Sequence, residues 1–198
     1  MTTVFFVRHA QPRHDWADDR TRPLTDEGMK DTNLVLETLK DKCIDAFYCS
    51  PYQRSVDTIK SAAEFYGKPI VTDERFRERE CGHTYGNNKA MFEKRWTDHS
   101  FHEQGGESLE MVQKRNIEAL EELLLKEKGK TIVVGTHGTA LSTILYNYDN
   151  TYDLNDFMRI IDWMPYIIRL DFDGTKLLKK TEIAHIYKEY FQQQTAKR

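Results

Sequence analysis

The sequence contains few cysteines, prolines and glycines, and it has no long hydrophobic run. Its 198 residues include three cysteines, five prolines and ten glycines. Three cysteines are too few, and odd in number, for a disulfide framework, and their spacing fits no zinc-binding pattern. No stretch approaches the roughly 20 apolar residues that span a bilayer. The sequence therefore argues against a disulfide-rich scaffold, a zinc-binding module and a membrane-spanning helix.

An excess of charge of one sign is also missing. The chain has 29 Lys and Arg against 32 Asp and Glu, which gives a formal net charge of −3. Nucleic-acid-binding domains carry a clear basic excess, so we expect neither a nucleic-acid partner nor a membrane partner. The apolar run at residues 2–7 is too short for a signal peptide and no basic stretch precedes it, which favours a cytoplasmic location.

Short apolar runs alternate with longer amphipathic stretches along the chain. Because 39% of the residues are hydrophobic, 198 residues can fill one core, and we expect a single domain spanning 1–198. The alternation predicts an α/β domain with a mostly parallel sheet. Strands are expected at 4–7, 46–49, 69–71 and 131–135, a hairpin at 166–183, and helices at 26–42, 50–67, 107–128 and 139–147.

Capping signals indicate where the first two helices begin. Thr25 is a good N-cap for the first helix. Ser50 is the expected N-cap of the second helix, with Pro51 in its first turn. The expected inner stripe of the first helix is Met29, Val35, Leu36 and Leu39.

Residues 73–106 interrupt the alternation. They are irregular, rich in charge and aromatic residues, and contain Gly82, Gly105 and Gly106. Irregular segments of this length in compact domains are usually functional or disordered. We therefore expect an inserted cap, built from loop and helix, at 73–106.

Basic and imidazole side chains follow three of the expected strands. Arg8 and His9 come directly after the first strand, Arg54 shortly after the second and His137 after the fourth. The carboxyl ends of parallel strands form one edge of a sheet, where ligands bind. Arginine binds phosphate oxygens in pairs, helix starts add backbone N–H groups, and a neutral imidazole can attack phosphorus. The pattern predicts a site for a phosphate group.

Five short motifs occur in order along nearly the whole chain. They are Arg8-His9-Ala10, Leu24-Thr25 before Gly28, Ser50-Pro51-Tyr52-Gln53-Arg54, Gly106-Glu107-Ser108 and Thr136-His137-Gly138. This ordered set resembles the histidine phosphatase superfamily, and within it the phosphoglycerate mutase-like branch. The resemblance implies a three-layer α/β/α sandwich and a phosphohistidine intermediate, with no metal and no cofactor.

The resemblance also implies a role for each matching residue. It implies that His9 is the nucleophile and that Arg8 and Arg54 bind the phosphoryl oxygens. It also implies that His137 binds the transferred phosphoryl group and stabilises the charge on it. The stretch 76–82 resembles the family segment that supplies a proton donor. Glu78 matches the donor position and Glu80 is its competitor. A carboxylic acid is needed there because an alkoxide is a poor leaving group.

The chain departs from the family pattern after the nucleophile. Ala10 stands where the family usually has glycine, and Gln11-Pro12 replaces the acidic continuation common in mutases. These differences favour a phosphatase over a phosphoglycerate mutase, and a module that binds a phospho-ligand without turnover is a further alternative. The expected partner is a small phosphorylated substrate, with a phosphoprotein also open. Neither the substrate nor the oligomeric state can be derived from the sequence, and Arg22 is expected at the surface.

Overall fold

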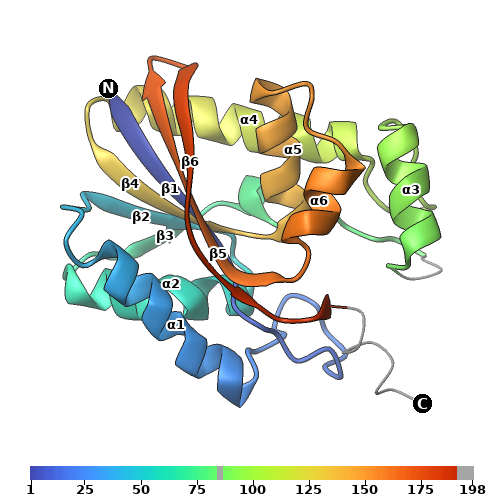
Figure 1. Cartoon of the computed structure of the whole chain (residues 1–198), viewed down its shortest axis with the longest axis horizontal. Coiled ribbons are helices and arrows are strands. Elements are labelled where there is room, and N and C mark those ends of the chain that lie inside the picture. The colour runs from blue at the N-terminus through green and yellow to red at the C-terminus, as the bar shows by residue number, and fades with distance from the viewer. Residues whose placement is uncertain (84–86, 191–198) are drawn as a thin grey trace.

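The computed structural model describes residues 1–83 and 87–190 (Figure 1). These residues form one six-stranded sheet in the order β3-β2-β4-β1-β5-β6. The first four strands in that order are parallel, and β5 runs antiparallel to both β1 and β6. The strands are β1 (Thr2–Arg8), β2 (Ala46–Cys49), β3 (Ile70–Thr72), β4 (Thr131–Thr136), β5 (Trp163–Asp173) and β6 (Lys176–Tyr187).

Helices cover both faces of the sheet, as Figure 1 shows. One face carries α1 (Asp26–Leu39) and α2 (Gln53–Phe65), and the other carries α4 (Leu109–Lys126), α5 (Gly138–Tyr148) and α6 (Leu154–Ile160). The expected three-layer α/β/α sandwich is therefore confirmed. The segment 73–106 holds a short 3₁₀ helix, η1 (Glu74–Phe76), and α3 (Lys89–Thr97), which lies beyond α6 and away from the sheet.

The apolar run of β1 is continuous because both of its faces are buried. Val4 and Phe6 join the hydrophobic core on the α4 and α5 side. Phe5 and Val7 join the core on the α1 and α2 side. Successive side chains of a strand point to opposite faces, so a strand covered on both sides needs apolar residues at every position.

The inner stripe of α1 differs from the one expected. Thr25 caps the helix as predicted, and its Oγ1 accepts a hydrogen bond from Gly28 N at 2.9 Å. Met29, however, is 50% exposed. The neighbouring Gly28 is buried instead, with its Cα packed against the main chain of Gln11. A Cβ at this position would lie 2.3 Å from the carbonyl oxygen of Gln11. The close backbone approach at Gly28 turns the helix so that Met29 faces outward; the buried residues are Gly28, Thr32, Val35 and Leu39.

The second helix begins later than the sequence predicts. Its N-cap is Tyr52, so the prediction of Ser50 as N-cap is wrong. Ser50 is fully buried and its hydroxyl bonds the His137 ring instead, while also accepting a hydrogen bond from Tyr52 N. The Ser50 hydroxyl, which local spacing predicts to cap the helix, thus bonds a residue that is distant in the sequence.

Other boundaries lie close to those expected, with two additions. The hairpin strands β5 and β6 are longer than predicted, and α6 was not predicted at all. Asp153 and Asp156 form a reciprocal capping box at its start. Within residues 1–83 and 87–190, none of the helices combines the length and apolar character needed to cross a membrane.

Candidate active site

The structure brings most of the predicted site residues to one edge of the sheet. Arg8, His9, Arg54 and Glu78 line a single pocket of about 560 Å³. The loops at this edge continue the sheet hydrogen bonding: His9 N donates to Thr136 O at 3.1 Å. The carboxyl ends of β1, β2 and β4 therefore lie next to one another, as the strand order requires.

The His9 ring is held in one tautomer. Its Nδ1 lies 2.7 Å from the carbonyl oxygen of Ala10. A carbonyl oxygen only accepts hydrogen bonds, so Nδ1 carries the proton and Nε2 keeps its lone pair. Burial, with Arg54 and Arg8 nearby, holds the pKa of His9 well below its ordinary value. His9 is therefore a neutral imidazole with an unprotonated Nε2.

His137 lies behind His9 and is completely buried. Its ring meets the His9 ring edge-on, with 5.2 Å between centroids, and it has no surface in the pocket wall. Nε2 lies 2.7 Å from Ser50 Oγ, while Nδ1 has no hydrogen-bond partner among the described residues. Burial, then Arg54 and His9, hold the pKa of His137 well below 6.5. The role of His137 as a phosphate ligand stays a prediction.

Arg8 is fixed by backbone carbonyls at the end of α6. Its Nη1 donates to the carbonyl oxygens of Ile160, Ile161 and Trp163. The guanidinium also lies against Gly138, where a Cβ would be 3.3 Å from Arg8 Cζ. The glycine of Thr-His-Gly thus lets the arginine lie against the first turn of α5.

Arg54, in the first turn of α2, is held by a loop the sequence analysis left unassigned. Its Nη1 donates to Asp19 O at 2.6 Å and lies 3.2 Å from Asp19 Oδ1. Arg22 Nη1 contacts the same carboxylate at 2.9 Å. Arg22 was expected at the surface, but its side chain is only 22% exposed and lines the pocket. The charge-dense loop at 13–22 was the signal that could have located these residues.

Tyr52 is a further pocket residue that the sequence analysis did not assign to the site. Its ring packs against His137, with 5.1 Å between centroids. The guanidinium groups of Arg54 and Arg20 lie 4.9 and 5.2 Å from the centre of the same ring. The aromatic face thereby holds two cations beside the pocket.

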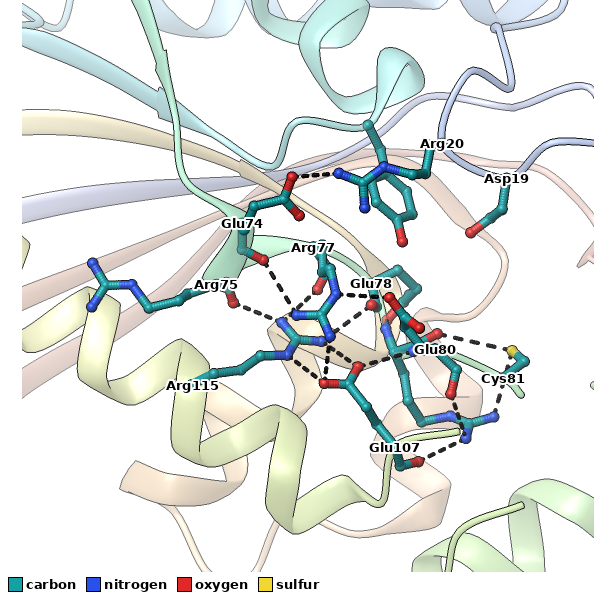
Figure 2. A network of polar contacts seen from close by, with 12 residues as sticks. Asp19, Arg20, Glu74, Arg75, Arg77, Glu78, Glu80, Cys81, Glu107 and Arg115 are labelled. Atoms are coloured by element: carbon teal, nitrogen blue, oxygen red, sulfur yellow. Dashed lines mark hydrogen bonds and ion pairs between the residues drawn. The ribbon is translucent and has the colours of Figure 1, made fainter. Parts of the chain in front are cut away.

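Glu78 and Glu80 both line the pocket, but their surroundings differ (Figure 2). Glu78 accepts hydrogen bonds from Thr139 N and Ala140 N, each at 3.1 Å, and so serves the exposed amides at the start of α5. Glu80 is 48% exposed and pairs with Arg77. The Glu78 carboxylate is therefore held by the main chain of α5, whereas that of Glu80 pairs with an arginine side chain. Which of the two is the proton donor stays a prediction.

The outer wall of the pocket comes from two distant segments of the chain. Arg79, Cys81 and Asn87 belong to the 73–106 segment, and Tyr190 follows β6. Arg79 is buried and its Nη1 donates to Glu103 Oε2 at 2.9 Å. Residue spacing could not predict this wall, because it depends on how the 73–106 segment and the chain after β6 pack against the pocket in three dimensions. No set of three or more His, Cys, Asp or Glu in residues 1–83 and 87–190 is arranged to hold a metal ion.

The two buried histidines predict a loss of stability as the pH falls. The pKa of His9 and of His137 is lowered well below 6.5 in the folded state. Below pH 6.5 these two histidines bind protons in the unfolded chain but stay neutral in the folded chain. The free energy of unfolding therefore decreases as the pH falls, until the folded-state pKa is reached. Each histidine accounts for at most about 1.4 kcal/mol per pH unit. Urea unfolding in phosphate-free buffers, from about pH 7.5 to about pH 5, measures this slope.

Removal of one of the two histidines provides the check. His137→Asn should show a shallower decrease of the free energy of unfolding below pH 6.5 than the wild type. A wild-type profile that stays flat over this range would contradict the burial of two neutral imidazoles.

Known proteins resemble this chain in sequence and in fold. The family model "Histidine phosphatase superfamily (branch 1)" matches residues 4–180. Phosphoserine phosphatase 1 of Hydrogenobacter thermophilus is 29% identical over 150 residues, which cover 69% of this chain and 71% of that protein. The 2,3-bisphosphoglycerate-dependent phosphoglycerate mutase 2 of Gloeobacter violaceus is 25% identical over 179 residues, covering 76% and 77%.

Solved structures show the same fold. YhfR of Bacillus stearothermophilus superposes with a TM-score of 0.74 at 23% identity, over 90% of this chain and 95% of that one. A phosphoserine phosphatase of Entamoeba histolytica, in complex with 3-phosphoglyceric acid, gives a TM-score of 0.74 at 20% identity, over 96% and 99%. At these identities the likeness concerns the fold.

Proposed function

The chain belongs to the histidine phosphatase superfamily (branch 1), and we propose that it is a phosphatase that hydrolyses a phosphomonoester through a phosphohistidine on His9, without a metal ion. One observation carries the proposal. The Nδ1–H of His9 is tied to the Ala10 carbonyl, which leaves a neutral Nε2 in a pocket that also holds Arg8 and Arg54. That is the arrangement a nitrogen nucleophile for phosphorus requires.

The first step transfers the phosphoryl group to the protein. The Nε2 lone pair of His9 forms a bond to phosphorus as the ester P–O bond breaks. The electron pair of that bond goes to the leaving oxygen, which takes a proton from Glu78. The Arg8 and Arg54 guanidinium groups neutralise the phosphoryl oxygens throughout, so positioning and electrostatics supply most of the rate.

The second step returns the enzyme to its starting state. A water molecule gives a proton to the Glu78 carboxylate and its oxygen bonds to phosphorus. The N–P bond breaks, and its electron pair returns to Nε2 of His9. The position of the Glu78 carboxylate, at the N-terminus of α5 and in the same pocket as His9, supports a role in both proton transfers.

Two features support hydrolysis over a mutase reaction. Gln11-Pro12 lacks the acidic continuation of mutases. A relative named as a phosphoserine phosphatase aligns with 69% of the chain. Phosphoglycerate mutase is the second candidate, because a relative of comparable coverage carries that name. The segment 73–106, which supplies part of the outer wall, serves in this proposal as the cap that selects the alcohol, and the substrate is a small phosphorylated compound.

Phosphate release tests the proposal. The enzyme should release phosphate from p-nitrophenyl phosphate and from members of a panel of phosphorylated metabolites, at the same rate with and without EDTA. EDTA is the informative addition because a metal-dependent phosphatase loses activity when its metal is chelated. The panel also ranks candidate alcohols.

The alternatives give different results in the same assays. Interconversion of the monophosphoglycerates without phosphate release would select the mutase. Phosphate binding with no turnover of any substrate would select the binding module. Loss of phosphate release in EDTA, restored by added metal, would overturn the metal-independent mechanism.

A further inference from the structure

The Gly106-Glu107-Ser108 motif and the helix that follows it have no role in the chemistry described above. They lie behind the pocket, against the backbone that carries Glu78. Arg115, on α4, lies about two helical turns beyond the motif. Its guanidinium contacts the Glu107 carboxylate (Figure 2). Both side chains are nearly buried, at 12% and 14% exposure.

Arg115 binds the main chain at Glu78 and just before it. Its Nη1 donates to Arg75 O at 2.7 Å and to Arg77 O at 2.8 Å, and its Nη2 donates to Glu78 O at 3.1 Å. Arg75 is the middle residue of η1, and Arg77 and Glu78 lie just beyond its end, where no helix or strand continues. One guanidinium therefore satisfies three carbonyls of the loop that carries Glu78.

Glu107 pairs with Arg115, and we call this ion pair, with its bonds to the loop around Glu78, the clamp. Its carboxylate accepts hydrogen bonds from Nε and Nη2 of Arg115, both at 2.9 Å, which is the paired geometry of an arginine–carboxylate fork. It also accepts from Arg77 Nη2 at 2.8 Å and from Glu80 N at 3.0 Å. The residues before and after Glu78 are thus held by one ion pair.

We propose that Arg115 and Glu107 are positioning residues that set the place of the Glu78 carboxyl in the pocket. The inference rests on the proposed function, in which Glu78 is the proton donor. The clamp joins the loop to α4, which packs on α5. The Glu78 carboxylate reaches the first turn of α5. Arg115 therefore fixes the loop relative to the helix that begins beside His137, and a proton donor displaced by about 1 Å can cost 10²-fold in rate.

The test compares two leaving groups in the variant Arg115→Met, which keeps the aliphatic stem and removes the fork. The comparison uses kcat/KM, because kcat also contains the hydrolysis of phospho-His9, which needs Glu78 with every substrate. The kcat/KM for a simple alkyl phosphate should fall about 30-fold, since its alkoxide needs the proton. The kcat/KM for p-nitrophenyl phosphate, whose leaving group needs no proton, should fall less than about 3-fold. Arg115→Lys should recover little, because an ammonium cannot bond three carbonyls and a carboxylate at once.

Arg75→Met is the matched control. Arg75 also joins this segment to α4, through Glu122, but its side chain contacts neither Glu78 nor Glu107. It should change kcat for both substrates less than about 3-fold, as expected of an exposed ion pair. If Arg115→Met does not fold, Glu107→Gln, which keeps the size and one acceptor oxygen, takes its place in the same comparison.

A double-variant cycle separates positioning from general loss of structure. In the Glu78→Gln background, Arg115→Met should cause no further loss with the alkyl phosphate, because the group it positions is already gone. Equal slowing of both substrates, or losses that add in the cycle, would overturn the inference. Failure of the proposed function is distinguishable, since Glu78→Gln alone would then show no dependence on the leaving group.

Discussion

His9→Ala is expected to lower kcat by roughly 10⁴-fold or more, because it removes the atom to which the phosphoryl group is transferred. Arg8 and Arg54 remain in the pocket, so the variant should still bind inorganic phosphate and a non-reacted substrate. Steady-state phosphate release and equilibrium binding, measured on the same preparation, separate these two effects.

A histidine outside the pocket provides the comparison. His102 is exposed and lies in the 73–106 segment, with its ring beside the Glu103 carbonyl. His102→Ala should keep wild-type turnover within about 2-fold, as surface changes usually do. Full activity of His9→Ala would remove His9 from the chemistry, and loss of phosphate binding together with turnover would point to a disrupted pocket.

Glu78→Gln is expected to divide substrates by their leaving groups. With a simple alkyl phosphate, kcat/KM, which reports phosphoryl transfer to His9 and not the hydrolysis step common to all substrates, should fall about 10²- to 10³-fold. General acid catalysis supplies a factor of this size when the leaving oxygen is strongly basic. With p-nitrophenyl phosphate the decrease should be less than about 10-fold. Glutamine keeps the size of the side chain and can still accept from Thr139 N, so the start of α5 retains a cap. Measuring kcat/KM against leaving-group basicity over a series of esters gives the result directly.

Glu80→Gln is the control for this prediction. Glu80 lines the same pocket, two residues along the chain, but its carboxylate pairs with Arg77 and faces solvent. The effect of Glu80→Gln on the rate should be the same for alkyl phosphates and for p-nitrophenyl phosphate. If Glu80→Gln shows the steep dependence and Glu78→Gln does not, the proton donor is Glu80 and the positions of the two acids must be exchanged in the mechanism.

The parts of the site that could be predicted from the sequence are those set by strand order. Arg8 and His9 end one buried strand, and His137 ends another that pairs with it in parallel. Apolar runs identify such strands, and their carboxyl ends meet at one edge by topology alone. The three-layer sandwich was implied by the family resemblance. The apolar run of β1 from Val4 to Val7 agrees with it, since such a strand is covered on both faces.

The parts that could not be predicted depend on contacts between distant segments. Ser50 has the spacing of a helix cap, yet the His137 ring takes its hydroxyl. Asp19 pairs with both Arg22 and Arg54 because the 13–22 loop folds over the start of α2. Local propensity carries no information on such partners, and a charged loop is by default expected in solvent.

The depth of His137 is a second case. Sequence order places it beside Arg8 and Arg54, and the structure does place it at the same edge. Its side chain is nevertheless buried behind His9 and Tyr52. Which side chain forms the surface of a pocket and which supports it from behind is set by packing in three dimensions, which residue spacing does not encode.

The measurement that tests the central claim most directly is detection of the phosphoenzyme. The wild type is mixed with p-nitrophenyl phosphate, quenched in denaturing alkaline solution during turnover, and digested for peptide mass spectrometry. The account predicts one phosphoryl group on His9, absent in His9→Ala, which forms and disappears as fast as phosphate is released. Steady turnover with no phosphorylated His9, or a phosphoryl group on another residue, would contradict it.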